Sequence, residues 1–246
     1  MSNTDPFERF AAISDLDPRN ESLRKHFFQE VFRKHGVKAV LDCACGTGSD
    51  LILVHGLGMQ VRGSDISDAM LQQAREKLGR NNLKIPLVKA DFSELPRYFD
   101  RPFDAVLCLT TSLPQVLTED NVRRALGSMR EVLAPKGILV LNQGMSDRQW
   151  HDRVRFHPVV STADHTRIIV VDYYESEWEA HVLDVFHGEG SPGFYVNSFR
   201  YLKMLEDDYV RLLDEVHFRD VHVYGGFDMR PYNKKETSSL VIVAGR

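Results

Sequence analysis

The segment DCACGTG at residues 42–48 places an acidic residue and two closely spaced glycines directly after a short apolar run. Glycine has no Cβ, so Gly46 and Gly48 allow a ligand to approach the backbone closely. If a helix follows, its unpaired N–H groups bind an anion such as an amino-acid carboxylate. Asp42 can orient the ammonium of the same ligand through a water molecule. In this context the pattern favours a ligand site over an ordinary tight turn.

Further acidic residues stand where the next apolar runs end. A carboxylate at Asp65, at the tip of a second strand, can accept hydrogen bonds from both hydroxyls of a ribose. Ile66 and Met70 are placed to flank an adenine ring. Asp91 can accept from an adenine amino group while the backbone N–H of Phe92 meets the ring. Together these residues predict a site for a nucleoside joined to an amino acid.

The elements that must position these residues alternate between strand and helix. Apolar runs predict strands at 37–43, 60–65, 84–91, 103–110 and 137–142, and helical spacing predicts helices at 21–35, 67–78 and 118–134. This rhythm implies right-handed crossovers and a doubly wound, mainly parallel α/β sheet. Carboxyl ends of parallel strands share one edge, where such sheets bind ligands. We therefore expect the three acidic residues to converge.

The rhythm changes between residues 150 and 203. Strand patterns follow one another there without helices, which predicts an antiparallel insertion in a core made of 1–149 and 204–246. A helix at 204–216 and two antiparallel strands close the chain. The span 150–205 holds 10 of the 24 aromatic residues and five of the ten histidines, so we expect it to contact the substrate, although strands also favour aromatics. The candidate contacts are Tyr173, Tyr174, Trp178, Tyr195 and Arg200.

Composition excludes several partners and cofactors. The formal net charge is −4 and no run of Lys or Arg exceeds two, so a nucleic-acid partner is not expected. No apolar run is long enough for a membrane span, the polar N-terminus does not resemble a signal peptide, and three cysteines form no disulfide framework. We expect a cytoplasmic protein. No metal is expected, because His181 and His187 share one face of a strand and Asp184 does not. The oligomeric state stays open.

Several segments resemble those of class I S-adenosylmethionine-dependent methyltransferases, over nearly the whole chain. VLDCACGTG is similar to their first motif, GSDIS to the second, KADF to the adenine-binding segment, and FDAVLCL with REVLAPKGILVLN to later core segments. The resemblance implies a seven-stranded Rossmann-like methyltransferase fold, S-adenosylmethionine as cofactor and S-adenosylhomocysteine as product. The cofactor site it implies, together with the reasoning above, comprises Arg19, Asp42, Ala44, Gly46, Gly48, Asp65, Ile66, Met70, Asp91, Phe92 and Leu109.

Within that superfamily the chain is most similar to the glycine/sarcosine N-methyltransferase group, through ACGTGSDL, SDISDAML and FDAVLCL. In that group an arginine at the place of Arg19 reaches the cofactor carboxylate. Glycine-methylating members also have an arginine after the fifth strand that takes the substrate carboxylate, whereas this chain has Asn142-Gln143-Gly144-Met145. The difference disfavours glycine as the acceptor.

The expected activity is methyl transfer to a small-molecule acceptor, with an amine nitrogen as the favoured atom. Alternatives are a small-molecule O-methyltransferase, methylation of a protein or RNA, and a cofactor-binding scaffold without activity. A nicotinamide-dependent oxidoreductase is disfavoured because its fingerprint places a third glycine where Leu51 stands. The leaving group is good and bulk solvent can take the proton, so we assign no catalytic base.

Overall fold

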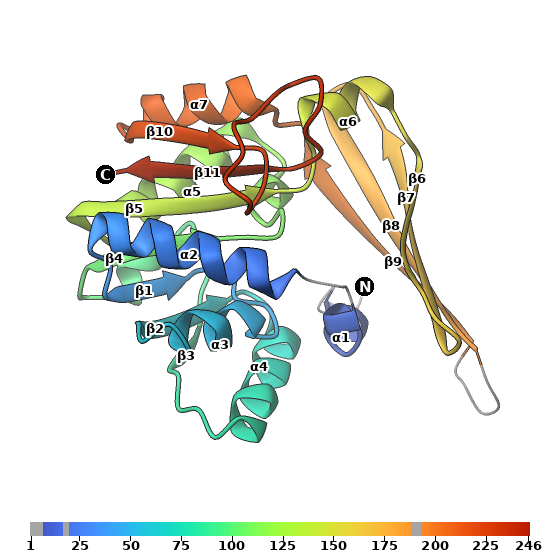
Figure 1. The fold of residues 1–246 in the computed structure, drawn as a ribbon, viewed down its shortest axis with the longest axis horizontal. Coiled ribbons are helices and arrows are strands. Elements are labelled where there is room, and N and C mark those ends of the chain that lie inside the picture. Colours follow the sequence, from blue (N-terminus) through green and yellow to red (C-terminus); the bar gives the residue numbers. More distant parts are fainter. Residues whose placement is uncertain (1–6, 17–19, 188–192) are drawn as a thin grey trace.

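The computed structural model describes residues 7–16, 20–187 and 193–246, and these residues form two separate sheets (Figure 1). Within them, seven strands form one sheet in the order β10-β11-β5-β4-β1-β2-β3, and four form a second in the order β6-β7-β8-β9. The strands of the first sheet are β1 (Ala39–Asp42), β2 (Gln60–Asp65), β3 (Leu87–Lys89), β4 (Phe103–Cys108), β5 (Leu133–Gln143), β10 (Arg219–Tyr224) and β11 (Leu240–Gly245).

The first sheet confirms the predicted doubly wound architecture. Strands β1 to β5 pair in parallel, while β11 runs antiparallel to both β5 and β10. The helices around it are α2 (Glu21–His35), α3 (Ser49–His55), α4 (Asp68–Arg80), α5 (Glu119–Glu131) and α7 (Glu206–Glu215). Ser67 caps α4 by accepting from the N–H of Met70, as its residue type predicts.

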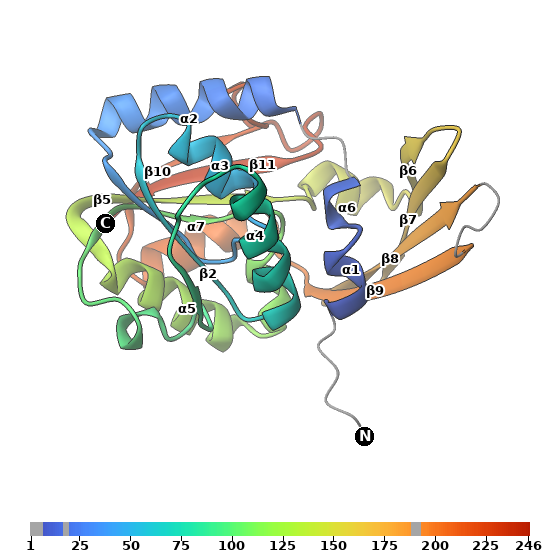
Figure 2. The same cartoon turned by 90° about the horizontal axis from the view of Figure 1, so that it is seen from below.

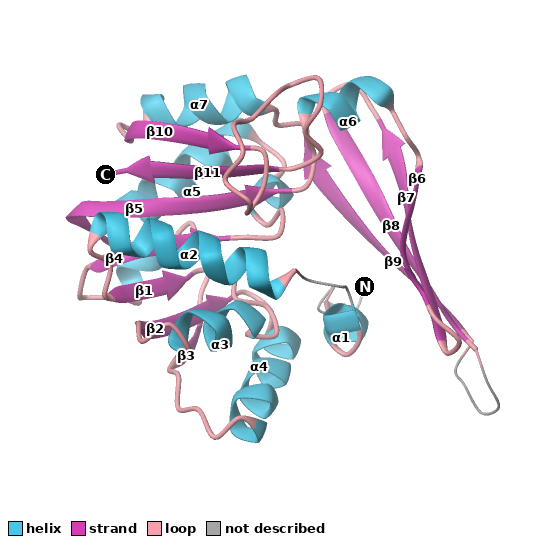
Figure 3. Cartoon of the chain, in the orientation of Figure 1, coloured by secondary structure: helices cyan, strands magenta, loops and turns pink. Residues whose placement is uncertain are grey.

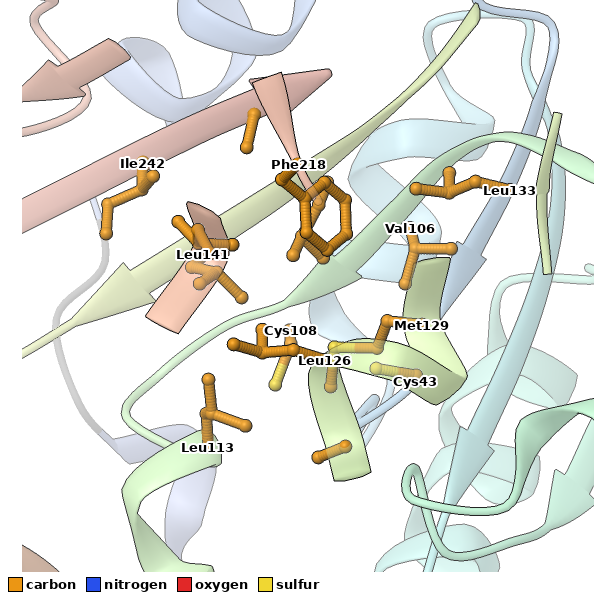
Figure 4. Close-up of a cluster of buried hydrophobic side chains, with 14 of the residues drawn as sticks. Cys43, Val106, Cys108, Leu113, Leu126, Met129, Leu133, Leu141, Phe218 and Ile242 are labelled. Atoms are coloured by element: carbon orange, nitrogen blue, oxygen red, sulfur yellow. The ribbon is translucent and has the colours of Figure 1, made fainter. Parts of the chain in front are cut away.

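Helices cover both faces of this sheet, as Figures 2 and 3 show. On one face, Phe28 of α2 and Leu71 of α4 belong to a buried cluster with the inner strands. On the other face, Leu126 and Met129 of α5 pack with Phe218 and Cys43 (Figure 4). Both faces of the parallel strands are therefore buried, which explains their continuous apolar sequences.

The second sheet consists of β6 (Phe156–Ser161), β7 (His165–Tyr173), β8 (Glu177–Phe186) and β9 (Phe194–Leu202), paired antiparallel throughout. Figures 1 and 3 show it beyond the arrowheads of the parallel strands, at the carboxyl edge of the first sheet. The short helices α1 (Glu8–Ala11) and α6 (Asp147–Asp152) lie near the same edge. The carboxyl edge of the first sheet therefore faces the second sheet.

Some predicted boundaries are wrong. The helix expected over 118–134 ends at Glu131, and Pro135 lies within β5 instead of terminating the helix. Residue pairing shifts between Phe103 and Ala105 opposite this part of β5, and proline is tolerated at such an irregularity because no ladder donor is needed there. The short helices α1 and α6, together with the 3-10 turns η1 (Ser14–Leu16), η2 (Leu95–Arg97) and η3 (Leu113–Val116), were not predicted.

All three cysteines are unpaired and buried. Among the described residues, no helix is both long and apolar enough to span a bilayer.

Candidate active site

The turn after β1 carries the predicted glycines at the carboxyl edge of the first sheet. Gly46 and Gly48 have φ angles of 50° and 82°, in the left-handed region that favours glycine. A Cβ at Gly48 would also lie 3.3 Å from the Cβ of Ala74 on α4. Both positions therefore require glycine to keep this turn close to α4.

Asp65 at the tip of β2 is held in place by two backbone donors. Its Oδ2 accepts from the N–H of Gly46 at 2.8 Å, and its Oδ1 accepts from the N–H of Ser67 at 2.9 Å. A carboxylate has about four acceptor positions, so these bonds orient the group and leave capacity for a ligand. The glycine turn and Asp65 of β2, which are separate motifs in the sequence, are therefore joined by a hydrogen bond.

A cavity of about 420 Å³ opens at this edge, with walls from the first sheet, the second sheet and the N-terminal segment. A volume of this order suits a small molecule. Its lining includes several residues predicted for the cofactor, namely Ala44, Gly46, Asp65, Ile66, Met70, Phe92 and Leu109.

One side of this cavity suits a flat ring beside a sugar. Ile66 is 57% exposed although it is large and apolar, and it lines the cavity together with Met70 and Phe92. These apolar side chains come from the same edge as the carboxylate of Asp65. The residues therefore fit the adenosine part of the predicted cofactor, with apolar surface for the base and an oriented acceptor for the ribose.

Other predicted cofactor residues lie off the cavity surface. Asp42 is 2% exposed and Gly48 is also buried; neither is among the lining residues. Asp91, at the end of β3, accepts from the N–H of Ser93 at 2.8 Å and also does not line the cavity. Arg19 falls outside the described residues.

The buried carboxyl of Asp42 is strongly perturbed. Burial, with the nearby charges of Asp50 and Asp65, raises its pKa to about 8, although the N–H of Ala44 donates to its Oδ1 at 3.3 Å. At neutral pH this carboxyl therefore holds a proton for most of the time in the ligand-free protein. A cation bound nearby would favour its ionised form.

A second acid beside the turn, Asp50 of α3, was missed in the sequence. It lines the cavity, and its Oδ1 accepts from Arg24 of α2 at 3.1 Å (Nε) and 2.5 Å (Nη2). The guanidinium also lies 4.3 Å from the ring centre of Phe227. The pair joins residues 26 apart, and no local sequence pattern distinguishes it from surface charges.

The N-terminal segment bridges the two sheets over the cavity. Asp15 accepts from Thr47 (2.7 Å) and Ser49 (3.1 Å) and pairs with Lys77 of α4 at 2.5 Å. Partial burial opposes its ionisation, but the hydrogen bonds and charge of Lys77, with the hydroxyls, leave the pKa of Asp15 below its usual value. The glycine turn is thus tied to the chain that covers it.

The other end of this segment packs on the second sheet. Phe7 stacks on Phe199 of β9 at 5.3 Å, and Phe10 meets the same ring edge-on at 5.1 Å. Both rings line the cavity, as does Ser14. The segment therefore supplies part of the cavity wall as well as a connection between the sheets.

The loop after β4 forms the middle of the cavity, because β4 lies between β1 and β5 in the sheet. Thr110 and Thr111 both line the cavity and adopt left-handed φ angles of 57° and 63°, which cost β-branched residues roughly 1–2 kcal/mol each. Thr111 holds this shape through hydrogen bonds, donating to the carbonyl of Asn142 and accepting from the N–H of Gly144. Such strain is typical of functional sites.

The inner face of the second sheet forms the opposite wall. Trp178 and Tyr201 stack at 4.1 Å between ring centres and line the cavity. Trp178 is thus the predicted substrate residue that the structure places there. Burial raises the pKa of Tyr201 to about 12, so its hydroxyl is neutral at physiological pH.

The remaining predicted substrate residues lie elsewhere. Tyr174 is 51% exposed, and Tyr173 packs against Trp150 while donating to the carbonyl of Val154 at 2.9 Å. Tyr195 lies beside Phe186 toward the far end of the sheet, and Arg200 pairs with Glu177 on the opposite face. None of these lines the cavity. Arg200 is on the outer face because strand residues alternate. Tyr173 and Tyr195 share the face of Trp178 but lie at other positions along the sheet, so the aromatic content of the segment did not identify the lining residues.

A buried ionic cluster spans the second sheet. Arg167 donates from Nε to Asp184 at 2.7 Å and from Nη2 to the carbonyl of Ile13 at 2.8 Å, and His165 Nε2 lies 2.7 Å from the same carboxylate. His181, which the sequence offered as a possible metal ligand, is not part of this cluster, and its Nδ1 lies 2.7 Å from the hydroxyl of Ser198. The described residues contain no group suited to holding a metal ion.

Comparison with known proteins identifies the family to which this chain belongs. Residues 40–137 match the family model of a methyltransferase domain. A glycine/sarcosine N-methyltransferase of Aphanothece halophytica is 32% identical over 227 residues, covering 91% of this chain and 82% of that protein.

Solved structures share the fold over the whole chain. An S-adenosylmethionine-dependent methyltransferase from Clostridium acetobutylicum superposes with a TM-score of 0.83 at 16% identity, covering 97% of this chain and 98% of that one. An amino pentose methyltransferase from Micromonospora echinaspora, solved with S-adenosylmethionine bound, gives a TM-score of 0.73 at 20% identity, covering 100% and 99%.

Proposed function

The chain belongs to the S-adenosylmethionine-dependent methyltransferases, and we propose that it methylates an amine nitrogen of a small molecule. The observation that carries this proposal is a cavity with two unlike walls: an oriented carboxylate with apolar neighbours on one side, and an aromatic sheet face on the other. The similarity to a glycine/sarcosine N-methyltransferase supports nitrogen as the acceptor atom.

We assign the cofactor to the edge formed by β1, β2 and β3. Asp65 binds the ribose hydroxyls, because its carboxylate is already oriented by two backbone N–H groups. Ile66, Met70 and Phe92 enclose the adenine, and the turn around Gly46 binds the methionine part. Asp42, buried directly behind this surface, acts on the cofactor's amino-acid end.

The segment 150–203 acts as the acceptor region in this proposal. Bound S-adenosylmethionine supplies an electrophilic methyl group on a positively charged sulfur. The protein positions the acceptor in line with it and excludes water. The inner face of the second sheet, with Phe7 and Phe10, provides that enclosure, and the strained loop at Thr110–Thr111 lies between the two walls.

His157 of β6 supplies a hydrogen-bond acceptor to the amine. Its ring lines the cavity, and its Nε2 lies 2.8 Å from the carbonyl of Val154. A carbonyl only accepts, so Nε2 carries the hydrogen and Nδ1 of the neutral ring is left as an acceptor. Tyr201, on the second-sheet wall, keeps its proton at physiological pH and therefore does not act as a base.

Labelled S-adenosylmethionine and matched amines and alcohols test the proposal. Product analysis by mass spectrometry and NMR locates the methyl group. We expect label on nitrogen with S-adenosylhomocysteine released in equal amount. Transfer to oxygen alone, or to protein or RNA with no small amine accepted, would refute the assignment.

A further inference from the structure

We infer that the acceptor is an amine with an apolar body and no carboxylate. This inference rests on the proposed amine methylation and narrows it, because the described cavity residues offer nothing that would neutralise an anion on the acceptor side.

The charge of the cavity has the wrong sign for a carboxylate acceptor. Among the described lining residues there is no Lys or Arg, and the acidic residues there are Asp50 and Asp65. An anion placed between these walls would lose its water without gaining an ion-pair partner from a described lysine or arginine side chain of the lining, which is costly. An amine, in contrast, is compatible with a weakly negative cavity.

The guanidinium groups of the second sheet are committed to other contacts. Arg167 faces inward but is 0% exposed, and it is bound to Asp184 and to the carbonyl of Ile13. Arg200, on the outer face, pairs with Glu177. Neither side chain lines the cavity, so neither replaces the substrate arginine missing after the fifth strand.

The acceptor wall is a continuous apolar surface. Val171 and Ala180 are register partners on β7 and β8, as are Ile169 and Val182 in the next row, and all line the cavity. Phe199, the partner of Ala180 on β9, extends this surface. Ala180 has the smallest side chain of the group and leaves room above it. This surface suits a ring or a branched alkyl group, whose burial is favourable.

The described polar side chains on this side include no lysine or arginine. Gln115, Gln149 and His157 line the cavity with the hydroxyl of Tyr201. They can orient an amine or a hydroxyl, but Gln149 already uses its amide oxygen to accept from the N–H of Ser146 at 3.0 Å. The wall therefore selects the acceptor by apolar contact and by hydrogen bonds that involve no lysine or arginine.

Matched acceptors that differ by a carboxylate give a direct test. Phenethylamine is compared with phenylalanine, and 2-cyclohexylethylamine with cyclohexylalanine, alongside glycine and sarcosine, with kcat/KM measured for each. We expect the apolar amines to exceed their carboxylate-bearing counterparts by at least about tenfold. Equal or greater kcat/KM for the amino acids would overturn the inference while leaving amine methylation intact. Methylation confined to alcohols would instead refute amine methylation itself.

Adjacent isoleucines provide a matched pair of variants. Ile169→Arg places a guanidinium on the cavity face, whereas Ile168→Arg places it on the opposite face of the same strand. We expect Ile169→Arg to reduce the preference for phenethylamine over phenylalanine by about tenfold or more, and Ile168→Arg to leave that ratio unchanged. S-adenosylhomocysteine affinity, measured by calorimetry, verifies that both variants are folded. An unchanged ratio in folded Ile169→Arg would contradict the inference.

Discussion

Replacing Asp42 by Asn should flatten the pH dependence of the ligand-free protein's stability. Burial, reinforced by Asp50 and Asp65, raises the pKa of Asp42 from 3.8 to about 8. In the unfolded chain the carboxyl titrates near its ordinary value. Between about pH 4 and pH 8 the folded protein therefore holds a proton that the unfolded chain has released, and the free energy of unfolding decreases as the pH rises.

The expected magnitude follows from that pKa difference. A shift from 3.8 to about 8, at about 1.36 kcal/mol per unit, corresponds to on the order of 5 kcal/mol over the whole window. The loss is about 1.4 kcal/mol per pH unit inside the window and ends above about pH 8. Asn has nearly the same shape and no ionisable proton, so Asp42→Asn removes this slope.

Urea denaturation at several pH values between about 5 and 8 measures the effect as the change in unfolding free energy. Asp100→Asn, at an exposed carboxyl, is the matched control and should retain the wild-type slope. Equal slopes for wild-type protein and Asp42→Asn would refute the reasoning, because the buried carboxyl would then be ionised at little cost.

Further substitutions test the two walls of the cavity. Asp65→Ala should weaken S-adenosylmethionine binding by about 1.5–3 kcal/mol in calorimetry, and unchanged affinity would exclude the ribose assignment. Trp178→Ala should lower kcat/KM for the acceptor by a factor equivalent to about 1–3 kcal/mol. Tyr174→Ala, at an exposed side chain, should leave kcat/KM unchanged. Equal effects of the two substitutions would mean that contact with the cavity is unimportant. His157→Gln should raise KM for the amine by a factor equivalent to on the order of 1 kcal/mol, and an unchanged KM would contradict the hydrogen-bond role. Asp184→Asn should lower the free energy of unfolding by about 3–5 kcal/mol because it leaves a buried arginine uncompensated; a loss below about 1 kcal/mol in urea denaturation would contradict this.

The amino-acid sequence by itself determined the parallel core and the family. Apolar periodicity and the cap at Ser67 are local features, and they indicate helices and strands close to those observed. The glycine turn and Asp65 were recognisable for the same reason, since a strand, a turn and a helix N-terminus are contiguous in the chain.

The tertiary structure alone decided which residues meet in the cavity. Trp178 and Tyr174 are both aromatic residues of one segment, yet Trp178 lies on the inner face of β8 while Tyr174 lies just after β7 and is exposed. Asp15 reaches Lys77, and Arg167 meets the carbonyl of Ile13, across separations that no sequence periodicity records. Periodicity reports which face of an element is buried, whereas the partner of that face depends on how distant elements pack. The edge that we assign to the cofactor could therefore be located from the sequence, whereas the wall that we assign to the acceptor could not.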